Sequence, residues 1–319
     1  MTYELPTPAK PLNIGTRGSP LALAQAYETR ARLSAAFDLP HGAFNIVVIK
    51  TTGDDRSLID ADKPLKTLGG KGLFTREIEQ DMIDGKIDIA VHSMKDMPTL
   101  QPNGLVLDTY LPREDVRDAF ISPRATGLAD LATGTVVGTS SLRRRAQLKL
   151  RRPDLEVVEF RGNMQTRLQK LDNGVAEATF LAMAGLNRLK MDEVPKYAIE
   201  VNDMLPAVAQ GAIGIERRID DTRAADMLAA IHDLQTGQRL AAERMFLKTL
   251  DGSCETPIAS LAELNGDTLR LRGEVLRPDG SENITGDMTG TIADGPAMGA
   301  EMARKMLDQA GDDFFSWRD

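Results

Sequence analysis

The stretch Gly138 to Leu148, GTSSLRRRAQL, decides the fold that we expect for this chain. The preceding residues, 135–137, have the character of the end of a buried strand, and a helix is expected from Leu142 onward. The turn between them is rich in hydroxyl groups. Such a turn points backbone N–H groups and the positive end of a helix dipole at one place, where Ser or Thr caps the helix or binds a ligand. The pattern therefore predicts an anion site.

Arg143 and Arg144 extend this expected site. Each guanidinium is a planar set of donors that suits a carboxylate or a phosphate. Neighbouring residues on a helix lie about 100° apart, so three consecutive arginines cannot all face one ligand. We expect Arg145 to face water. The alternative is that the three arginines form a solvated basic helix face.

The same order of elements occurs near the N-terminus. A short strand at 12–15 is followed by Thr16-Arg17-Gly18-Ser19-Pro20 and by an Ala- and Leu-rich helix at 21–37. Ser19 suits the N-cap and Pro20 the first helical position. Arg17 beside this helix start predicts a second anion contact, and the alternative is an ordinary capped helix.

Further strands alternate with helices, which predicts an α/β fold. Arg161 follows one strand and precedes a helix that carries Arg167, and Arg188 comes after the next strand. Asn265-Gly266 and Asp279-Gly280 favour hairpins, so a small α+β domain is expected at the C-terminus. The strands are expected at 44–50, 87–91, 156–160, 178–182 and 212–216.

The strand at 87–91 runs into His92-Ser93-Met94-Lys95-Asp96-Met97-Pro98. Ligands of open α/β sheets gather at the carboxyl ends of strands. Asp96 is the best candidate for acid–base or cation-stabilising chemistry, and the alternative is a surface pair with Lys95. We interpret His92 as a hydrogen-bonded core histidine.

Residues 53–72 end in Gly69-Gly70-Lys71-Gly72. A nucleotide-binding Walker loop needs Gly where this chain has Leu65 and Ser or Thr where it has Gly72, so that function is rejected. A mobile lid is the interpretation that we favour for this stretch.

Composition excludes several classes of protein. A net charge of −8 with 27% charged residues over 319 residues indicates a soluble globular protein without a general nucleic-acid-binding face. The single cysteine, Cys254, excludes an internal disulfide, and with only three histidines it argues against a zinc site. No apolar run approaches the roughly 18 residues of a membrane span, and the N-terminus has no secretory h-region. We expect a cytoplasmic protein without metal or membrane partner.

Several blocks together resemble one family. GTRGSPLALAQ, GGKGLF, AVHSMKDMP, VVGTSSLRRRAQL, FRGNMQTRL, LAMAGLNRL, PAVAQGAIGIE and GSCETPI occur in the order found in the porphobilinogen deaminases, also called hydroxymethylbilane synthases. The resemblance covers the chain from about residue 12. It implies a transferase of tetrapyrrole and heme biosynthesis that joins four porphobilinogen molecules head to tail, with release of ammonia, into hydroxymethylbilane.

The resemblance also implies a cofactor and a domain plan. The cofactor is a dipyrromethane primer held through a thioether, and the matching cysteine is Cys254, which on its own residue chemistry is a structural thiol. The implied fold has two α/β domains like those of periplasmic binding proteins, a cleft between them, and a third domain carrying the cysteine loop. The domains expected are an N-terminal extension at 1–11, domain 1 at 12–111 plus 212–230, domain 2 at 112–211, and domain 3 at 231–319.

The resemblance assigns roles to individual residues. Each porphobilinogen ring carries an acetate and a propionate, so a growing chain needs a cleft lined with cations. Asp96 is the implied catalytic carboxylate, stabilising the positive charge left when ammonia departs. The implied cofactor and substrate contacts are Arg17, Ser19, Lys71, Lys95, Thr139, Ser141, Arg143, Arg144, Arg161, Arg167 and Arg188.

Two departures and two alternatives remain. Thr67 stands where related chains carry Lys, with Lys66 one place earlier, and Ala209 replaces a glycine in the segment 205–211 that crosses between domains. The first alternative is a non-catalytic anion-binding receptor-like module. The second is a cysteine hydrolase that pairs Cys254 with one of the histidines His41, His92 and His232. The family implies a monomer.

Overall fold

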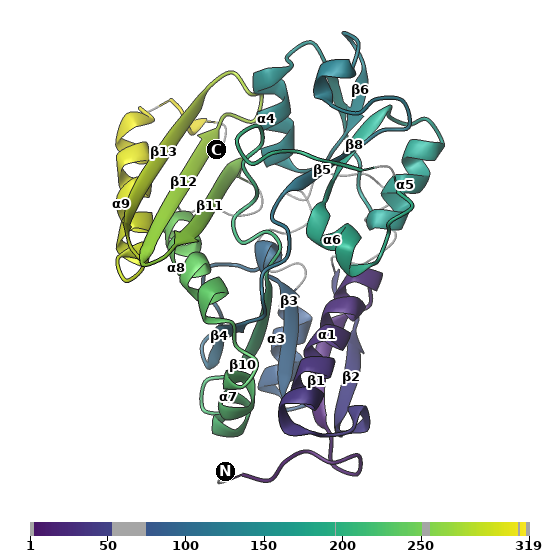
Figure 1. Cartoon of the computed structure of the whole chain (residues 1–319), viewed down its shortest axis with the longest axis vertical. Coiled ribbons are helices and arrows are strands. Elements are labelled where there is room, and N and C mark those ends of the chain that lie inside the picture. Colours follow the sequence, from purple (N-terminus) through teal and green to yellow (C-terminus); the bar gives the residue numbers. More distant parts are fainter. Residues whose placement is uncertain (1–2, 53–74, 195, 251–255, 312, 317–319) are drawn as a thin grey trace. The chain divides into compact units, whose positions relative to one another are not determined.

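The computed structural model describes residues 3–52, 75–194, 196–250, 256–311 and 313–316 (Figure 1). The chain divides into two compact units, and each contains residues from separate parts of the sequence. Of the described residues, unit 1 contains 3–52, 75–113 and 212–237, and unit 2 contains those from 114 to 211 and from 238 onward.

Unit 1 is built on a five-stranded sheet in the order β2-β1-β3-β10-β4. The first three of these strands are parallel, while β10 is antiparallel to both β3 and β4. The strands are β1 (Leu12–Arg17), β2 (Phe44–Ile49), β3 (Ile89–Ser93), β4 (Leu105–Tyr110) and β10 (Ile213–Arg218).

Helices cover both faces of this sheet. Ile89 and Val91 of β3 share a core cluster with residues of α1 (Pro20–Phe37) and α7 (Thr222–Ala229). Ala90 instead packs with residues of α3 (Arg76–Ile83). Because successive strand residues point to opposite faces, α1 and α7 cover one face and α3 the other. The short 3-10 turns are η1 (His41–Ala43) and η4 (Met94–Asp96).

Unit 2 contains a second five-stranded sheet, in the order β7-β6-β8-β5-β9. Strands β6, β7 and β8 are parallel, and β5 is antiparallel to β8 and β9. The elements are β5 (Asp118–Ile121), η5 (Leu128–Asp130), β6 (Val136–Gly138), α4 (Leu142–Arg151), β7 (Glu156–Val158), α5 (Met164–Asp172), β8 (Ala178–Ala182), α6 (Met183–Arg188) and β9 (Tyr197–Ala198).

The C-terminal part of unit 2 is an antiparallel sheet of three strands with helix α9 packed on it (Figure 1). Its hairpins turn at Gly266 and Gly280, whose φ angles of 58° and 74° favour glycine. This is the small α+β region expected from the sequence. The elements are α8 (Leu234–Thr249), β11 (Ile258–Asn265), β12 (Thr268–Leu276), β13 (Asn283–Thr291) and α9 (Gly295–Gln309).

The two five-stranded sheets share one topology. In each, three parallel strands are followed by an antiparallel strand and then by an edge strand. The antiparallel strands, β5 and β10, are the first strands after the chain passes from one unit to the other. The predicted α/β fold class is confirmed. The contacts group residues 238–319 with unit 2, so the three domain boundaries stay a prediction.

Within the described part of the chain, no helix is long and apolar enough to cross a membrane.

Candidate active site

The carboxyl ends of β1 and β3 in unit 1 meet at a small cavity of about 80 Å³. Three residues that the sequence predicted as catalytic or binding residues line it, namely Arg17, Ser19 and Asp96. Unit 1 therefore brings an arginine, a helix cap and a carboxylate to one place. The other lining residues are Leu21, Ala22, Gln25, Thr75, Val91, His92, Ser93 and Met97.

Helix α1 begins as the sequence predicted. Ser19 is its N-cap, with a side-chain oxygen that accepts from the backbone N–H of Ala22 at 3.3 Å, and Pro20 is the first helical residue. Behind this turn, the buried Thr16 hydroxyl donates to the carbonyl of Ala22 at 3.2 Å. These bonds hold the positive end of the helix dipole at the cavity beside Arg17.

Asp96 is the last residue of η4 and is exposed at the cavity wall. The backbone N–H of Met94 donates to the carbonyl of Ala212 at 3.0 Å, and that of Met97 donates to Met94 at 3.2 Å. A Cβ on Gly214 of β10 would lie 2.0 Å from the sulfur of Met94. The turn that presents Asp96 is therefore packed closely against β10.

Polar side chains line the inner side of the same cavity. The amide of Gln25 donates to the Ser93 hydroxyl at 2.8 Å. Nε2 of His92 lies 2.9 Å from a carboxylate oxygen of Glu216. Both members of this second pair are buried. The interpretation of His92 as a hydrogen-bonded core histidine is confirmed.

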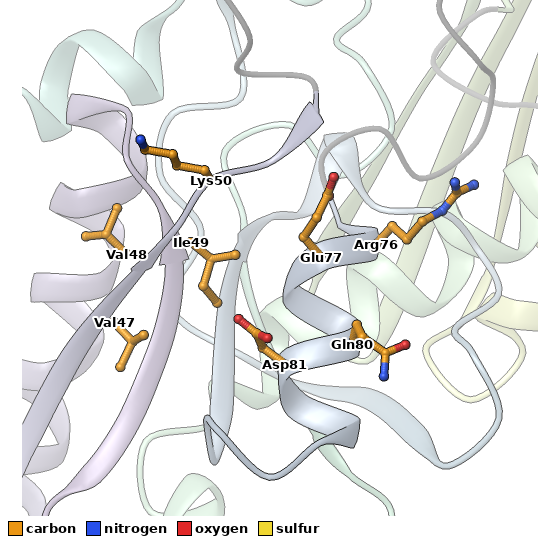
Figure 2. Close-up of a pocket in the computed structure, with 8 residues that line it drawn as sticks. All are labelled: Val47, Val48, Ile49, Lys50, Arg76, Glu77, Gln80 and Asp81. Carbon is orange, nitrogen blue, oxygen red and sulfur yellow. The ribbon is translucent and has the colours of Figure 1, made fainter.

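A larger cavity, of about 620 Å³, lies between β2 and α3 (Figure 2). Figure 2 shows Ile49 and Asp81 turned toward each other across the gap, with Arg76 turned away. Burial would raise the pKa of Glu77 in its wall, but hydrogen bonds from Thr52 outweigh it and lower that pKa. The wall carries two carboxylates beside two cations, Lys50 and Arg76, and none of its residues was predicted for the site. The smaller cavity with Asp96 is therefore the better candidate.

Unit 2 places helix starts at the carboxyl ends of β6 and β7. Ser141 is the N-cap of α4 and accepts from the N–H of Arg144 at 3.4 Å, while the Thr139 hydroxyl accepts from the N–H of Ser141 at 3.2 Å. Ser140 accepts from the N–H of Phe160 at 2.8 Å, which ties this turn to the next one. The hydroxyl turn predicted at 138–141 is confirmed.

The second of these turns carries Arg161. It is buried, at 7% exposure, and precedes Asn163, the N-cap of α5, which carries Arg167. Arg188 ends α6 and donates from Nη2 to the carbonyl of Gly211 at 3.0 Å. These arginines follow the parallel strands β7 and β8 of unit 2, in the order that the sequence indicated.

Arg143 and Arg144 have a partner that the sequence did not predict. Both are buried, at 5% and 4% exposure, and their Nη2 atoms lie 2.8 and 2.7 Å from the two carboxylate oxygens of Asp118. Arg144 also donates to the carbonyl of Phe180 at 2.9 Å. The guanidinium groups thus point to a protein carboxylate. Arg145 keeps 40% of its side-chain exposure, as expected.

Asp118 is the residue that sequence reasoning missed. Its burial would raise its pKa, but the charges of Arg143 and Arg144 outweigh that effect and hold the pKa far below its usual range. Burial lowers the pKa of Arg143. Asp118 stands in a strand that precedes α4 by more than twenty residues, so no local pattern links it to the arginines.

Some residues that the sequence singled out lie outside the described residues, namely Lys66, Thr67, Lys71 and Cys254. Lys95 is half-buried in η4 next to Asp96. Among the residues that the structure describes, no group of three His, Cys, Asp or Glu side chains could hold a metal ion.

Comparison with known proteins identifies the family. A family model described as "Porphobilinogen deaminase, dipyromethane cofactor binding domain" matches residues 12–226. The chain belongs to the porphobilinogen deaminase family. A second model, the porphobilinogen deaminase C-terminal domain, matches residues 238–308. The chain therefore carries the cofactor-binding domain of this family together with its C-terminal domain.

Curated porphobilinogen deaminases are similar over almost the whole chain. The protein from Paracoccus denitrificans is 64% identical over 314 residues, covering 98% of this chain and 99% of its own. The protein from Nitrobacter hamburgensis is 50% identical over 303 residues, covering 95% of each. Among solved structures, the periplasmic VFT2 domain of BvgS from Bordetella pertussis aligns with a TM-score of 0.42 at 14% identity, covering 73% of this chain and 91% of that one.

Proposed function

We propose that this chain joins four porphobilinogen molecules head to tail, with release of ammonia, into hydroxymethylbilane on a covalently bound dipyrromethane primer. The observation that carries the assignment of the site is the cavity of unit 1, where Asp96 shares one wall with Arg17 and the capped start of α1. It acts as a monomer in the cytoplasm.

The substrate explains the distribution of basic residues. Every porphobilinogen ring carries two carboxylates, and the chain as a whole is acidic. Cations must therefore be concentrated locally, at helix starts where backbone N–H groups add to their field. Arg17 and Ser19 supply such a place in unit 1. Thr139, Ser141, Arg161 and Arg167 supply it in unit 2. Arg188 adds a charge at the end of α6, and Lys71 and Lys95 complete the set of contacts.

The residues present fit a dipyrromethane group. Arg143 is buried, yet its Nε has no hydrogen-bond partner among the described residues. Buried donors need an acceptor, and a carboxylate of the cofactor is a suitable one. Arg143 and Arg144 would hold the group together with Arg161, and Cys254 would attach it through a thioether. When bound, the group supplies the pyrrole carbon to which the first substrate is joined.

Asp96 would act on the substrate itself. Departure of ammonia from the aminomethyl group leaves a delocalised positive charge on the pyrrole ring. A carboxylate held near the pyrrole N–H stabilises that charge as it develops and assists proton transfer. The exposed position of Asp96 on a turn anchored to β10 lets it meet a ligand with little reorganisation.

Intact-mass measurement tests the proposal. The purified chain should be heavier than its sequence by two linked pyrrole units, and Cys254→Ala should have the bare mass, because this is the only cysteine. Incubation of the native protein with porphobilinogen should release ammonia and hydroxymethylbilane. A native chain with neither the added mass nor turnover would refute the function and favour a non-catalytic anion receptor. An adduct that survives Cys254→Ala would refute the attachment site.

A further inference from the structure

We propose that His92 and Glu216 are positioning residues for Asp96, joined in a buried pair that fixes the seam between β3 and β10 from which the catalytic turn emerges. This inference rests on the proposed function, in which Asp96 is the catalytic carboxylate.

His92 and Glu216 lie on the neighbouring strands β3 and β10, near the carboxyl end of β3. In the antiparallel register, His92 is opposite Gly214, and Glu216 is opposite Ala90. Residues of this alternating set share the face of the sheet that α3 covers, since Ala90 belongs to the α3 cluster. Nε2 of His92 reaches Oε2 of Glu216 at 2.9 Å, a diagonal link between the two strands.

Folding alone does not explain this pair. The side chains retain 5% and 0% of their exposure, and Oε1 of Glu216 has no hydrogen-bond partner among the described residues. Buried ion pairs are often no more stabilising than apolar side chains of the same size, because desolvation opposes their attraction. A buried pair with an unsatisfied oxygen is therefore a feature that packing would not require.

A third ionisable group faces the pair from α3. Burial raises the pKa of Glu79, and the charge of Glu216 raises it further, while Thr75, His92 and Arg76 act in the opposite direction. Glu79 thus lies close enough to His92 and Glu216 for their charges to act on its carboxyl group. Thr75 and His92 also line the cavity that contains Asp96, so the pair borders the site.

Met94 connects the His92–Glu216 pair to the turn that carries Asp96. Met94 lies two residues beyond His92 on the same face, and its sulfur occupies the space that a side chain on Gly214 would need. Met94 also bonds to Ala212, just before β10 begins. A change in the distance between β3 and β10 at His92 therefore moves η4, and Asp96 is the last residue of η4.

Four variants test the proposal. His92→Ala removes the link, His92→Gln keeps an N–H donor near the place of Nε2, and Glu216→Gln keeps a hydrogen bond without the charge. His232→Gln is the matched control, because His232 is a hydrogen-bonded histidine of unit 1, accepting from the N–H of Tyr110 at 3.2 Å, and does not line the cavity. Cofactor load by intact mass, thermal unfolding, kcat and KM are measured for each.

The expected pattern separates positioning from general damage. His92→Ala should keep its cofactor and its KM within about twofold while kcat falls roughly 10- to 100-fold, the scale for small misplacements of a catalytic group. His92→Gln and Glu216→Gln should recover most of kcat, and His232→Gln should match the native kcat.

Three results would overturn the inference. They are a native kcat in His92→Ala, a loss of cofactor load that accounts for the loss of turnover, or an equal loss in His232→Gln. If His92→Ala does not fold, the two Gln variants carry the test, and a loss of kcat of roughly 10- to 100-fold in both, with the cofactor load intact, contradicts the inference. Failure of the proposed function is seen separately, as a native protein without adduct or turnover.

Discussion

Arg144 holds Asp118 through two N–H groups, with Nε at 3.2 Å and Nη2 at 2.7 Å from the same carboxylate oxygen. Arg143 approaches the other oxygen at 2.8 Å, and the side-chain amide of Gln210 donates to the first at 2.9 Å. The carboxylate is completely buried. Helix α4, strand β5 and the segment 205–211 of unit 2 thus converge on one negative charge.

Asp118→Asn should destabilise the protein strongly. Removing one member of a buried ion pair leaves a buried charge without its partner, which typically costs about 3–5 kcal/mol. Urea unfolding followed by circular dichroism measures the difference. Asp154→Asn is the control, because Asp154 pairs with Arg152 at 2.7 Å in a more exposed place, and its effect should be much smaller. Similar losses in the two variants would contradict the importance of the buried cluster.

The ion pairs of Asp118 with Arg143 and Arg144 also predict that the protein loses stability in acid. The pKa of Asp118 is lowered in the folded state, so its contribution is present above the ordinary value of about 3.9 and is lost as the pH falls below it. The free energy of unfolding of the native protein should therefore decrease on acidification below about pH 4. Asp118→Asn should show a flatter dependence over that range. Parallel curves for the two proteins would count against the assignment.

Asp96→Asn should separate chemistry from binding. The amide has the same shape, so fold and cofactor load should persist, while turnover falls by roughly 10²–10⁴-fold because a positioned acid–base group is lost. Steady-state turnover and intact mass are the measurements. Asp84→Asn, at the end of α3 and outside the cavity, should turn over normally. Near-normal turnover in Asp96→Asn would remove Asp96 from the mechanism.

Arg161→Leu should weaken binding. Arg161 is buried beside the start of α5, and loss of a charge-assisted hydrogen bond there should raise KM or reduce cofactor load by roughly 10- to 100-fold. Arg145→Leu is matched to it, since Arg145 faces solvent and pairs with Glu159 at 3.6 Å. Equal KM values and equal loads in both variants would show that Arg161 does not contact the ligand.

Gly211→Ala should destabilise unit 2. Gly211 has φ 88°, and an added Cβ would lie 2.5 Å from the carbonyl oxygen of Glu114. Backbone strain of this kind costs about 1–3 kcal/mol before the steric clash is counted. Ala209 already has φ 60°, so Ala209→Gly should be tolerated and serves as the comparison in thermal unfolding. A Gly211→Ala protein as stable as the native one would show that the turn rearranges freely.

Local features of the fold could be predicted from the sequence. Ser19 with Pro20, and Ser141 after its strand, carry the signal of a helix start within a few residues, and the structure has both caps. Asn265-Gly266 likewise encodes its own turn. Such signals are reliable because the interacting atoms are neighbours in the chain.

Pairings between distant residues could not be predicted in the same way. The sequence predicts Arg143 and Arg144 as ligand contacts, but it could not show that they also pair with Asp118, which stands in another strand and is brought to them by the sheet. The partner of His92 is Glu216, which enters the same sheet after the chain has passed through unit 2. Arg144→Leu would therefore leave the buried Asp118 with one arginine, in addition to any effect on ligand binding.

The position of β10 governs how this protein can be made. Among the described strands, β4 joins its sheet through β10 alone, yet residues 111–212 are synthesised between them, which takes roughly 5 to 20 seconds at about 5–20 residues per second. A nascent chain on the ribosome thus holds an open β3 edge throughout that interval. The turn of Asp96 gains its anchor at Ala212 only at the end. A chain truncated before Ala212 would contain Asp96 but would lack Ala212 and β10, which anchor the turn that carries it.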